Sequence, residues 1–191
     1  MIVTLASASP RRKELISQIK WINCNIIPSG ADESKIKNDN PIELTKALAL
    51  TKAQEVYTRC GGVVLGADTV VVVDDRILGK PQTESEATQF LKLLCGRAHQ
   101  VITAVAVVSE KKTLVDCEIS TVYMHPYDEE WAKAYIATKS PFDKAGGYGI
   151  QDEAFAPTLE KFDGELDNII GLPVKLTEKL LQEIAKTNGN D

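Results

Sequence analysis

The sequence has few of the residues that bind transition metals or form disulfide frameworks. Among its 191 residues are four cysteines, no two of them in a Cys-x-x-Cys pair, and two histidines, His99 and His125. A zinc site and a Cys–His nucleophile are therefore disfavoured. We expect the cysteines to be reduced and mostly buried, as in a cytoplasmic protein, and His99 to make structural hydrogen bonds.

No segment has the length and hydrophobicity that crossing a bilayer requires. The longest apolar run, residues 63–73, is short, and Asp68 interrupts it. The first residues also lack the charged region and long apolar stretch of a signal peptide. These features predict a cytoplasmic protein with no membrane partner.

An excess of basic charge is also absent. The chain has 22 Lys and Arg against 27 Asp and Glu, which gives a formal charge of −5. Binding to nucleic acid needs a dense basic face, so we expect no nucleic-acid partner. The net negative charge does not exclude a small anionic ligand in a locally basic pocket, because residues 1–30 contain four Lys or Arg and only one Glu.

What the sequence does contain is an alternation of short apolar strands and amphipathic helices, without repeats or linkers. Strands are predicted over 2–6, 63–73, near 78, 100–108 and 114–124. Helices are predicted from Pro10, over 41–57, 84–94 and 128–138, and from Pro173; Ser9, Asn40 and Thr83 are the expected N-caps of the first three. We therefore predict one domain over residues 1–191, of α/β or closely packed α+β class with a mixed sheet.

A strand end followed by a basic helix start is the first candidate site. Ser7 and Ser9 precede Pro10, and Arg11 and Arg12 fall in the first helical turn. Free N–H groups and the helix dipole attract an anion there, whereas arginines are electrostatically unfavourable for the helix itself. A bound polyphosphate or a solvated basic helix start would each explain the pattern. No P-loop sequence occurs.

Asp68 is the second candidate, because it interrupts an otherwise apolar strand. An ionised carboxylate in that position is costly unless it is paired or bound to a metal. Asp68 is thus a candidate general base or metal ligand, with Thr69 beside it as a polar contact. The alternative is a bulge at the strand end that lets Asp68 reach solvent.

Three further charged residues, Lys52, Lys80 and Glu33, are weak candidates when each is taken alone. Single charges of this kind are usually solvated, and the two lysines gain weight only if they converge on the site of Arg11 and Arg12. The helix that carries Lys52 is expected to bury four apolar residues, Leu44, Ala47, Leu48 and Val56.

The third candidate segment is rich in glycine, with three glycines between residues 146 and 149. Such a backbone can approach a ligand closely or adopt positive φ. Tyr148 could pack against a ring, Gln151 could read a base edge, Lys144 could contact phosphate, and Asp143 is a second carboxylate. The alternative is a purely structural turn. A Gly-x-Gly-x-x-Gly dinucleotide motif is absent.

Five ordered motifs and a closing tripeptide run through nearly the whole chain, from about residue 5 to residue 173. They are Ser7-x-Ser9-Pro10-Arg11-Arg12-x-x-Leu15, Gly66-Ala67-Asp68-Thr69, Leu78-Gly79-Lys80-Pro81, Gly96-x-x-His99-x-Val101-x-Thr103, Asp143-Lys144-Ala145-Gly146-x-Tyr148-Gly149-Ile150-Gln151 and Gly171-Leu172-Pro173. In this order they resemble the Maf family of nucleoside triphosphate pyrophosphatases.

The resemblance implies a cytoplasmic enzyme that cleaves a nucleoside triphosphate between its α- and β-phosphates and needs a divalent cation, Mg²⁺ or Mn²⁺. The family also suggests a homodimer. The form of the fifth motif looks like the branch that acts on dTTP and UTP rather than on 7-methyl-GTP. The implied fold is similar to that of inosine triphosphate pyrophosphatases, with an elongated mixed sheet and two lobes around a cleft.

The resemblance also assigns roles to individual positions. Asp68 matches the proton acceptor, and Arg11, Thr69 and Gln151 match positions that govern substrate choice. Other polar residues of the cleft correspond to Ser9, Arg12, Glu33, Lys52 and Lys80. Lys144, in the fifth motif, is added here as a phosphate contact.

The resulting hypothesis is metal-assisted hydrolysis. Asp68, together with Glu33 and phosphate oxygens, would hold a divalent ion, and Asp68 would accept the proton of the attacking water. Arginines and lysines of the site would neutralise the triphosphate and the departing pyrophosphate. The alternative is a nucleotide-sensing regulator of septum formation and cell division that binds without hydrolysis.

One departure from the family pattern lies next to the residue expected to read the base. Asp152 follows Gln151 where the family usually has glycine, Glu153 adds another carboxylate, and Gly147 replaces a more usual alanine. The additional negative charge bears on nucleotide preference rather than on the reaction.

Overall fold

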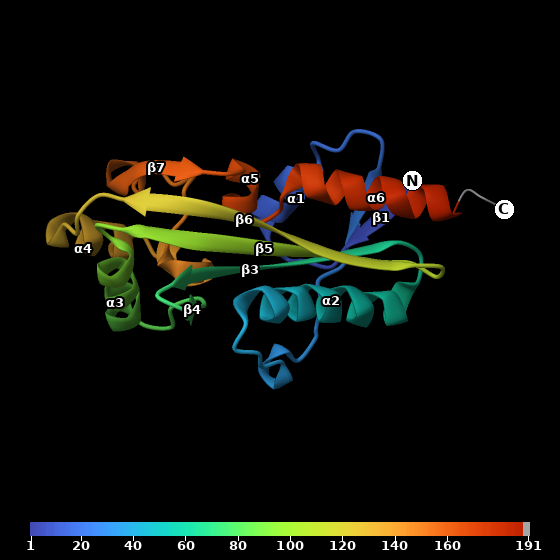
Figure 1. Ribbon diagram of the computed structural model, residues 1–191, viewed down its shortest axis with the longest axis horizontal. Coiled ribbons are helices and arrows are strands. Elements are labelled where there is room, and N and C mark those ends of the chain that lie inside the picture. Colours follow the sequence, from blue (N-terminus) through green and yellow to red (C-terminus); the bar gives the residue numbers. More distant parts are fainter. Residues whose placement is uncertain (189–191) are drawn as a thin grey trace. The chain divides into compact units, whose positions relative to one another are not determined.

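A mixed β-sheet with helices on its faces organises the computed structural model, which describes residues 1–188 (Figure 1). The strands are β1 (Ile2–Leu5), β2 (Asn23–Ile26), β3 (Val64–Val73), β4 (Arg76–Leu78), β5 (Ala98–Val108), β6 (Thr113–Met124) and β7 (Leu159–Asp163). The α-helices are α1 (Pro10–Ile16), α2 (Pro41–Cys60), α3 (Glu84–Leu94), α4 (Glu129–Ala137), α5 (Leu166–Ile170) and α6 (Val174–Asn188). Short 3-10 helices are η1 (Glu33–Lys35), η2 (Ser140–Asp143), η3 (Ala145–Gly147) and η4 (Ala156–Thr158).

The strand order is β2-β1-β3-β5-β6-β7, with β4 paired to β3 outside this path. β1 is parallel to both β2 and β3, whereas β3 pairs antiparallel with β4 and β6 pairs antiparallel with β7. Parallel and antiparallel pairs in one sheet, with helices between the strands, confirm the predicted mixed α/β class.

The chain divides into two compact units. Unit 1 comprises residues 1–68, 103–118 and those from 171 onward, and unit 2 comprises residues 69–102 and 119–170. Strands β3, β5 and β6 each contribute residues to both units. Two units agree with the two lobes that the family resemblance implies, and the assignment of residues 1–191 to a single domain stays a prediction.

The part of unit 1 where α2 packs on the sheet has a core rich in small side chains. Ala49 and Ala53 of α2 are fully buried against β3, while α6 covers the opposite face of the sheet (Figure 1). The predicted buried face of α2 was right for Val56 but wrong for Leu44, Ala47 and Leu48, which are only half-buried. The helix turns its smallest residues toward the sheet because this permits a closer approach.

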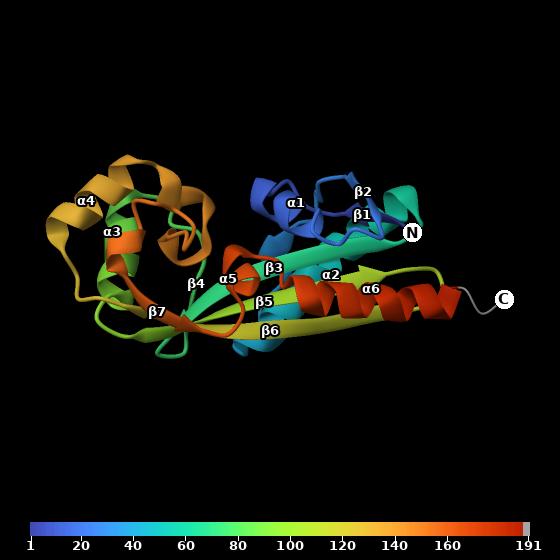
Figure 2. The same cartoon turned by 90° about the horizontal axis from the view of Figure 1, so that it is seen from above.

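Unit 2 has a core of larger and aromatic side chains. Leu91 and Leu94 of α3 and Tyr135 of α4 are almost fully buried, and the two helices lie side by side (Figure 2). The ring of Tyr148 stacks on that of Phe155 at a centroid distance of 4.6 Å. Tyr148 therefore packs inside the protein, and its ring is not the free stacking surface considered from the sequence.

Two further expectations concern the burial of the cysteines and the absence of a membrane-spanning segment. All four cysteines are free thiols, but only Cys95 is buried and Cys60 is exposed, so the expectation of mostly buried thiols was wrong. Cys60 ends α2, where the last turn meets solvent. Within residues 1–188, no helix is both long enough and apolar enough to cross a membrane.

His99, on β5 in unit 2, is buried and holds a hydrogen bond of 2.6 Å between its Nε2 and the Tyr148 hydroxyl. Its other ring nitrogen, Nδ1, has no hydrogen-bond partner among the described residues. Burial lowers the pKa of His99 from 6.5 to about 4, because a charged imidazolium is poorly solvated there. The structural role expected for this histidine is thus consistent with its environment.

This environment predicts a loss of stability in mild acid. The unfolded chain takes up a proton at His99 below pH 6.5 while the folded chain does not, so stability present above pH 6.5 is lost as the pH falls toward 4. We expect this loss to be about 3 kcal/mol, measured by urea unfolding across that range. His99→Gln should have a flatter profile over the same range, and identical slopes for the two proteins would contradict the prediction.

Candidate functional site

Three charged side chains of unit 1 meet at one point. The ammonium of Lys52, on α2, lies 2.5 Å from Asp68 Oδ1 on β3 and 3.1 Å from Glu33 Oε2 on η1. The Lys52 and Asp68 side chains are each 13% exposed, whereas that of Glu33 is 46% exposed. Residues predicted from separate sequence motifs therefore form one carboxylate–lysine cluster.

Asp68 lies well within β3 rather than at its end. Nine of the strand's ten residues are buried, including Asp68, and the Asp68 carboxylate accepts a hydrogen bond from the Lys52 ammonium. The alternative of a strand-end bulge reaching solvent is therefore wrong. An ionised carboxylate in an apolar strand needs a nearby cation, and Lys52 provides one.

Gly66 brings the two partners together. A Cβ added there would lie 2.3 Å from the Ala49 carbonyl oxygen and 2.8 Å from the Ala53 nitrogen, both in the backbone of α2. Only glycine therefore allows α2 to approach β3 so closely. Because Lys52 lies on this helix and Asp68 follows Gly66 by two residues, the same approach sets their separation.

Gly66→Ala is expected to force α2 away from β3 and to destabilise the protein by about 3 kcal/mol, since backbone atoms cannot yield as a flexible side chain can. Denaturant unfolding measures the loss. Gly79→Ala is the matched control, because a Cβ there meets nothing within 4 Å. Equal stability of the two variants would contradict the assignment.

The basic segment at the start of α1 lies in the same unit. Ser9 caps the helix by accepting a hydrogen bond from the Arg12 backbone N–H at 3.4 Å, as predicted. The Arg12 side chain donates from Nε to the Gly171 carbonyl at 2.8 Å. The Gly-Leu-Pro tripeptide of the sequence thus supplies the oxygen that orients this arginine.

Electrostatic coupling links Arg12 to the carboxylate–lysine cluster. Burial lowers the pKa of the Arg12 guanidinium, and the negative charges of Asp68 and Glu33 raise it, while the neighbouring Arg11 lowers it. The region of the cluster therefore combines cationic side chains with two carboxylates. Such a region suits a ligand that carries both phosphates and a metal ion.

The donor set of the cluster is suited to a divalent cation. Glu33 and Asp68 place two carboxylates around one positive charge, which is the Lys52 ammonium. No group of three or more His, Cys, Asp or Glu residues suited to a metal occurs within residues 1–188. Magnesium is commonly held by one or two carboxylates plus substrate phosphates and water. The two carboxylates therefore fit a metal that shares its coordination with phosphate.

The remaining predicted residues lie in unit 2. Thr69 is half-buried on β3, next to Asp68, and Lys80 is exposed after β4. Gln151 is exposed at the corner of a turn. Lys144 is almost buried, and its ammonium donates to the Ser140 carbonyl, the Ser140 hydroxyl and Asp143. The roles of these four residues toward a substrate stay predictions, and for Lys144 a phosphate would have to replace one of these contacts.

Two features of the site were missed in the sequence. Gly66 and Gly171 were both part of quoted motifs, but neither had an assigned role. An isolated glycine inside an apolar strand is a signal of close backbone approach, and it could have indicated the helix contact. The sequence offers no comparable signal for Gly171, because its contact is made by the backbone carbonyl.

The mixed α/β architecture is shared with a solved structure of very different sequence. A HAM1 protein from Coxiella burnetii superposes with a TM-score of 0.52 and 13% identity, covering 96% of this chain and 99% of that one. The chain therefore shares the fold of this HAM1 protein, and the mixed α/β class expected from the sequence is confirmed.

The sequence comparisons are more specific. A family described as Maf-like protein matches residues 2–184. A dTTP/UTP pyrophosphatase of Thermococcus gammatolerans is 43% identical over 179 residues, which are 94% of this chain and 95% of the relative. That of Symbiobacterium thermophilum is 43% identical over 180 residues, or 94% and 92%. The chain therefore belongs to the Maf family, which confirms the resemblance seen in its motifs.

Proposed function

We propose that this protein hydrolyses dTTP and UTP between the α- and β-phosphates to the nucleoside monophosphate and pyrophosphate. The carboxylate–lysine cluster of Asp68, Lys52 and Glu33 carries the proposal, in a chain whose curated relatives bear the name dTTP/UTP pyrophosphatase. A binding protein has no need of a buried carboxylate held against a lysine, whereas hydrolysis needs a base.

In the proposed reaction a water molecule attacks the α-phosphorus. Its oxygen forms a new bond to phosphorus, and the bond from that phosphorus to the bridging oxygen of the β-phosphate breaks. Asp68 accepts a proton of the attacking water, and the electron pair of the broken bond leaves with pyrophosphate. The contact with Lys52 holds the carboxylate in one orientation and so fixes where the proton is received.

The cationic side chains oppose the charge that grows on the departing pyrophosphate. Arg12 is oriented by the Gly171 carbonyl, and Lys52 lies beside Asp68. Arg11 and Lys80 are proposed to take part in the same neutralisation, with Ser9 shaping the start of α1. Fixed charges of this kind are most effective when they need not reorganise during the reaction.

Glu33 and Asp68 would hold the divalent ion, Mg²⁺ or Mn²⁺, together with phosphate oxygens. When bound, such an ion supplies charge neutralisation and makes a coordinated water more acidic. Thr69 and Gln151 are proposed to select the nucleotide, and Gln151 presents an exposed amide that can both donate and accept. Cytoplasmic location, the homodimer and the absence of a nucleic-acid partner stay predictions.

The test is pyrophosphate release from the common ribo- and deoxyribonucleoside triphosphates and 7-methyl-GTP, with magnesium and then with manganese. We expect release from dTTP and UTP well above that from purine nucleotides, and none after removal of divalent ions with a chelator. Release of inorganic phosphate in place of pyrophosphate would place the cleaved bond elsewhere. No release from any nucleotide would overturn the proposal and favour a protein that binds nucleotides without hydrolysis.

A further inference from the structure

Gln151 lies at the corner of a tight turn. The backbone N–H of Asp152 donates to the Gly149 carbonyl at 3.0 Å, which closes the turn around Ile150 and Gln151. Ile150 is buried in the core of unit 2, whereas Gln151 is exposed. The direction in which the Gln151 side chain leaves the protein is therefore set by the two ends of this turn.

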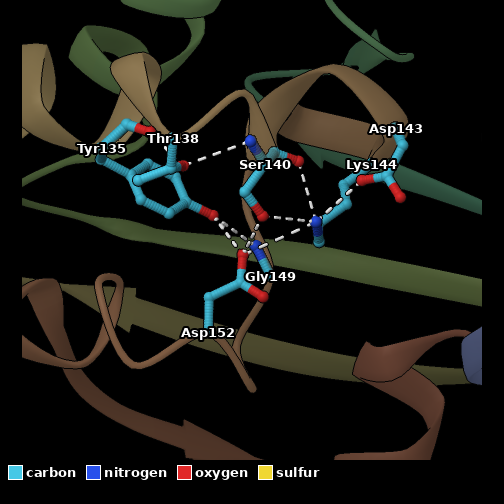
Figure 3. Close-up of polar contacts among 7 residues, drawn as sticks. All are labelled: Tyr135, Thr138, Ser140, Asp143, Lys144, Gly149 and Asp152. Carbon is cyan, nitrogen blue, oxygen red and sulfur yellow. Dashed lines mark hydrogen bonds and ion pairs between the residues drawn. The ribbon is translucent and has the colours of Figure 1, made fainter.

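The hydroxyl of Tyr135 joins those two ends. It accepts a hydrogen bond from the Gly149 backbone N–H at 2.9 Å and donates to Asp152 Oδ2 at 2.8 Å (Figure 3). Tyr135 is 1% exposed and belongs to α4. A rigid helix thus holds both ends of the turn through one oxygen atom.

Asp152 Oδ2 also accepts a hydrogen bond of 2.6 Å from the Ser140 hydroxyl, which in turn accepts one of 2.7 Å from Lys144. The Lys144 ammonium lies 3.6 Å from Asp152 and balances its charge in a place with little solvent. Figure 3 shows these side chains converging on Asp152. Hydrogen bonds that run in one direction through such a chain strengthen one another.

The side chains of Lys144 and Asp152 pack closely around Gly149. A Cβ added at this residue would lie 2.6 Å from Lys144 Cε and 2.8 Å from Asp152 Oδ2. The turn is therefore enclosed by the same side chains that hydrogen-bond to its ends. Any change at Asp152 or Tyr135 reaches Gln151 through the backbone of the turn.

We propose that Tyr135 and Asp152 are positioning residues that fix the turn bearing Gln151 and thereby set the preference of the enzyme for pyrimidine over purine nucleotides. The inference rests on the proposed function, in which Gln151 reads the base. A fixed amide reaches a base of one size at hydrogen-bonding distance, whereas a mobile turn would also accommodate the larger ring system of a purine.

The test compares steady-state hydrolysis of UTP and GTP by Tyr135→Phe, Asp152→Ala and Asp152→Asn. For the first two variants we expect the KM for UTP to rise and the UTP/GTP ratio of kcat/KM to fall, each about tenfold, with kcat for UTP within about twofold of the parent. Asp152→Asn keeps an oxygen that can accept from Tyr135 and Ser140, so it should retain most of the preference. Asp163→Asn, which alters an exposed carboxylate of the same unit, should change neither quantity.

A second comparison separates positioning from general damage. In a Gln151→Ala background, Tyr135→Phe should cause no further rise in the KM for UTP, because the residue it positions is gone. Equal effects of Tyr135→Phe in both backgrounds, or an unchanged UTP/GTP ratio in a folded variant, would overturn the inference. So would loss of folding in both Tyr135→Phe and Asp152→Ala, judged by circular dichroism, since the network would then be structural.

The result for the parent protein distinguishes the two proposals. If the parent releases pyrophosphate from UTP and the variants keep its preference, only the positioning role fails. If the parent releases no pyrophosphate from any nucleotide, the proposed function itself fails, and the inference fails with it.

Discussion

Asp68→Asn should lower the rate of pyrophosphate release by about 10³-fold, since an amide cannot accept the proton of the attacking water. The substitution preserves the size of the side chain and leaves an oxygen that can accept the hydrogen bond now donated by Lys52. We therefore expect the free energy of unfolding to change by no more than about 1 kcal/mol. The loss should appear in kcat, while nucleotide binding stays largely intact.

The measurements are single-turnover pyrophosphate release and calorimetric titration with a UTP analogue whose α–β bridge cannot be hydrolysed. Asp163→Asn is again the matched control, because its carboxylate is exposed and lies in the other unit. Turnover by Asp68→Asn equal to that of the parent would rule out Asp68 as the general base. A loss confined to binding would instead assign it to metal or substrate affinity.

Local sequence signals predicted those elements whose formation depends mainly on their own residues. The N-caps Ser9, Asn40 and Thr83 accept hydrogen bonds from the first turns of α1, α2 and α3, as expected. β3 was visible as an apolar run. By contrast, β2 has the sequence Asn-Cys-Asn-Ile, with no alternation, and exists because its residues pair in register with β1. β7 and α5 were also missed, since each is short and stabilised by tertiary contacts.

In the candidate site, too, local sequence features could be predicted and tertiary contacts could not. Asp68 could be identified because a carboxylate in an apolar strand needs an explanation, but its partner could not. Lys52 is one of many helical charges, and it reaches Asp68 only because Gly66 lets α2 approach β3. Tyr135 fits an ordinary buried helix position, so nothing in the sequence indicates that its hydroxyl holds the turn of Gln151. Asp152 could be recognised in the sequence as a departure from the family pattern, but its hydrogen bonds to Tyr135 and Ser140 could not be predicted.

Lys52→Met should lower both stability and turnover. Methionine is of similar length but leaves Asp68 and Glu33 without the cation that now lies between them. We expect a loss of about 2 kcal/mol in the free energy of unfolding, less than for a fully buried pair because Glu33 is 46% exposed. Turnover should fall by about 10²–10³-fold, since the ammonium no longer orients the base or opposes phosphate charge. Urea unfolding and pyrophosphate release measure the two effects.

The double variant Lys52→Met/Asp68→Asn separates these two contributions of the lysine. Neutralising Asp68 removes the carboxylate that the missing ammonium left unbalanced, so about 1 kcal/mol of the lost stability should return. Turnover should not recover and should lie at or below the level of Asp68→Asn, because the proton acceptor is absent and the ammonium that opposes phosphate charge is gone as well. Additive losses of stability would mean that Lys52 and Asp68 act independently, in contradiction to their 2.5 Å contact. Recovery of stability without recovery of turnover would show that the Lys52–Asp68 ion pair has two separate roles. Its charge balance stabilises the fold, and the orientation that it gives to the Asp68 carboxylate supports the reaction.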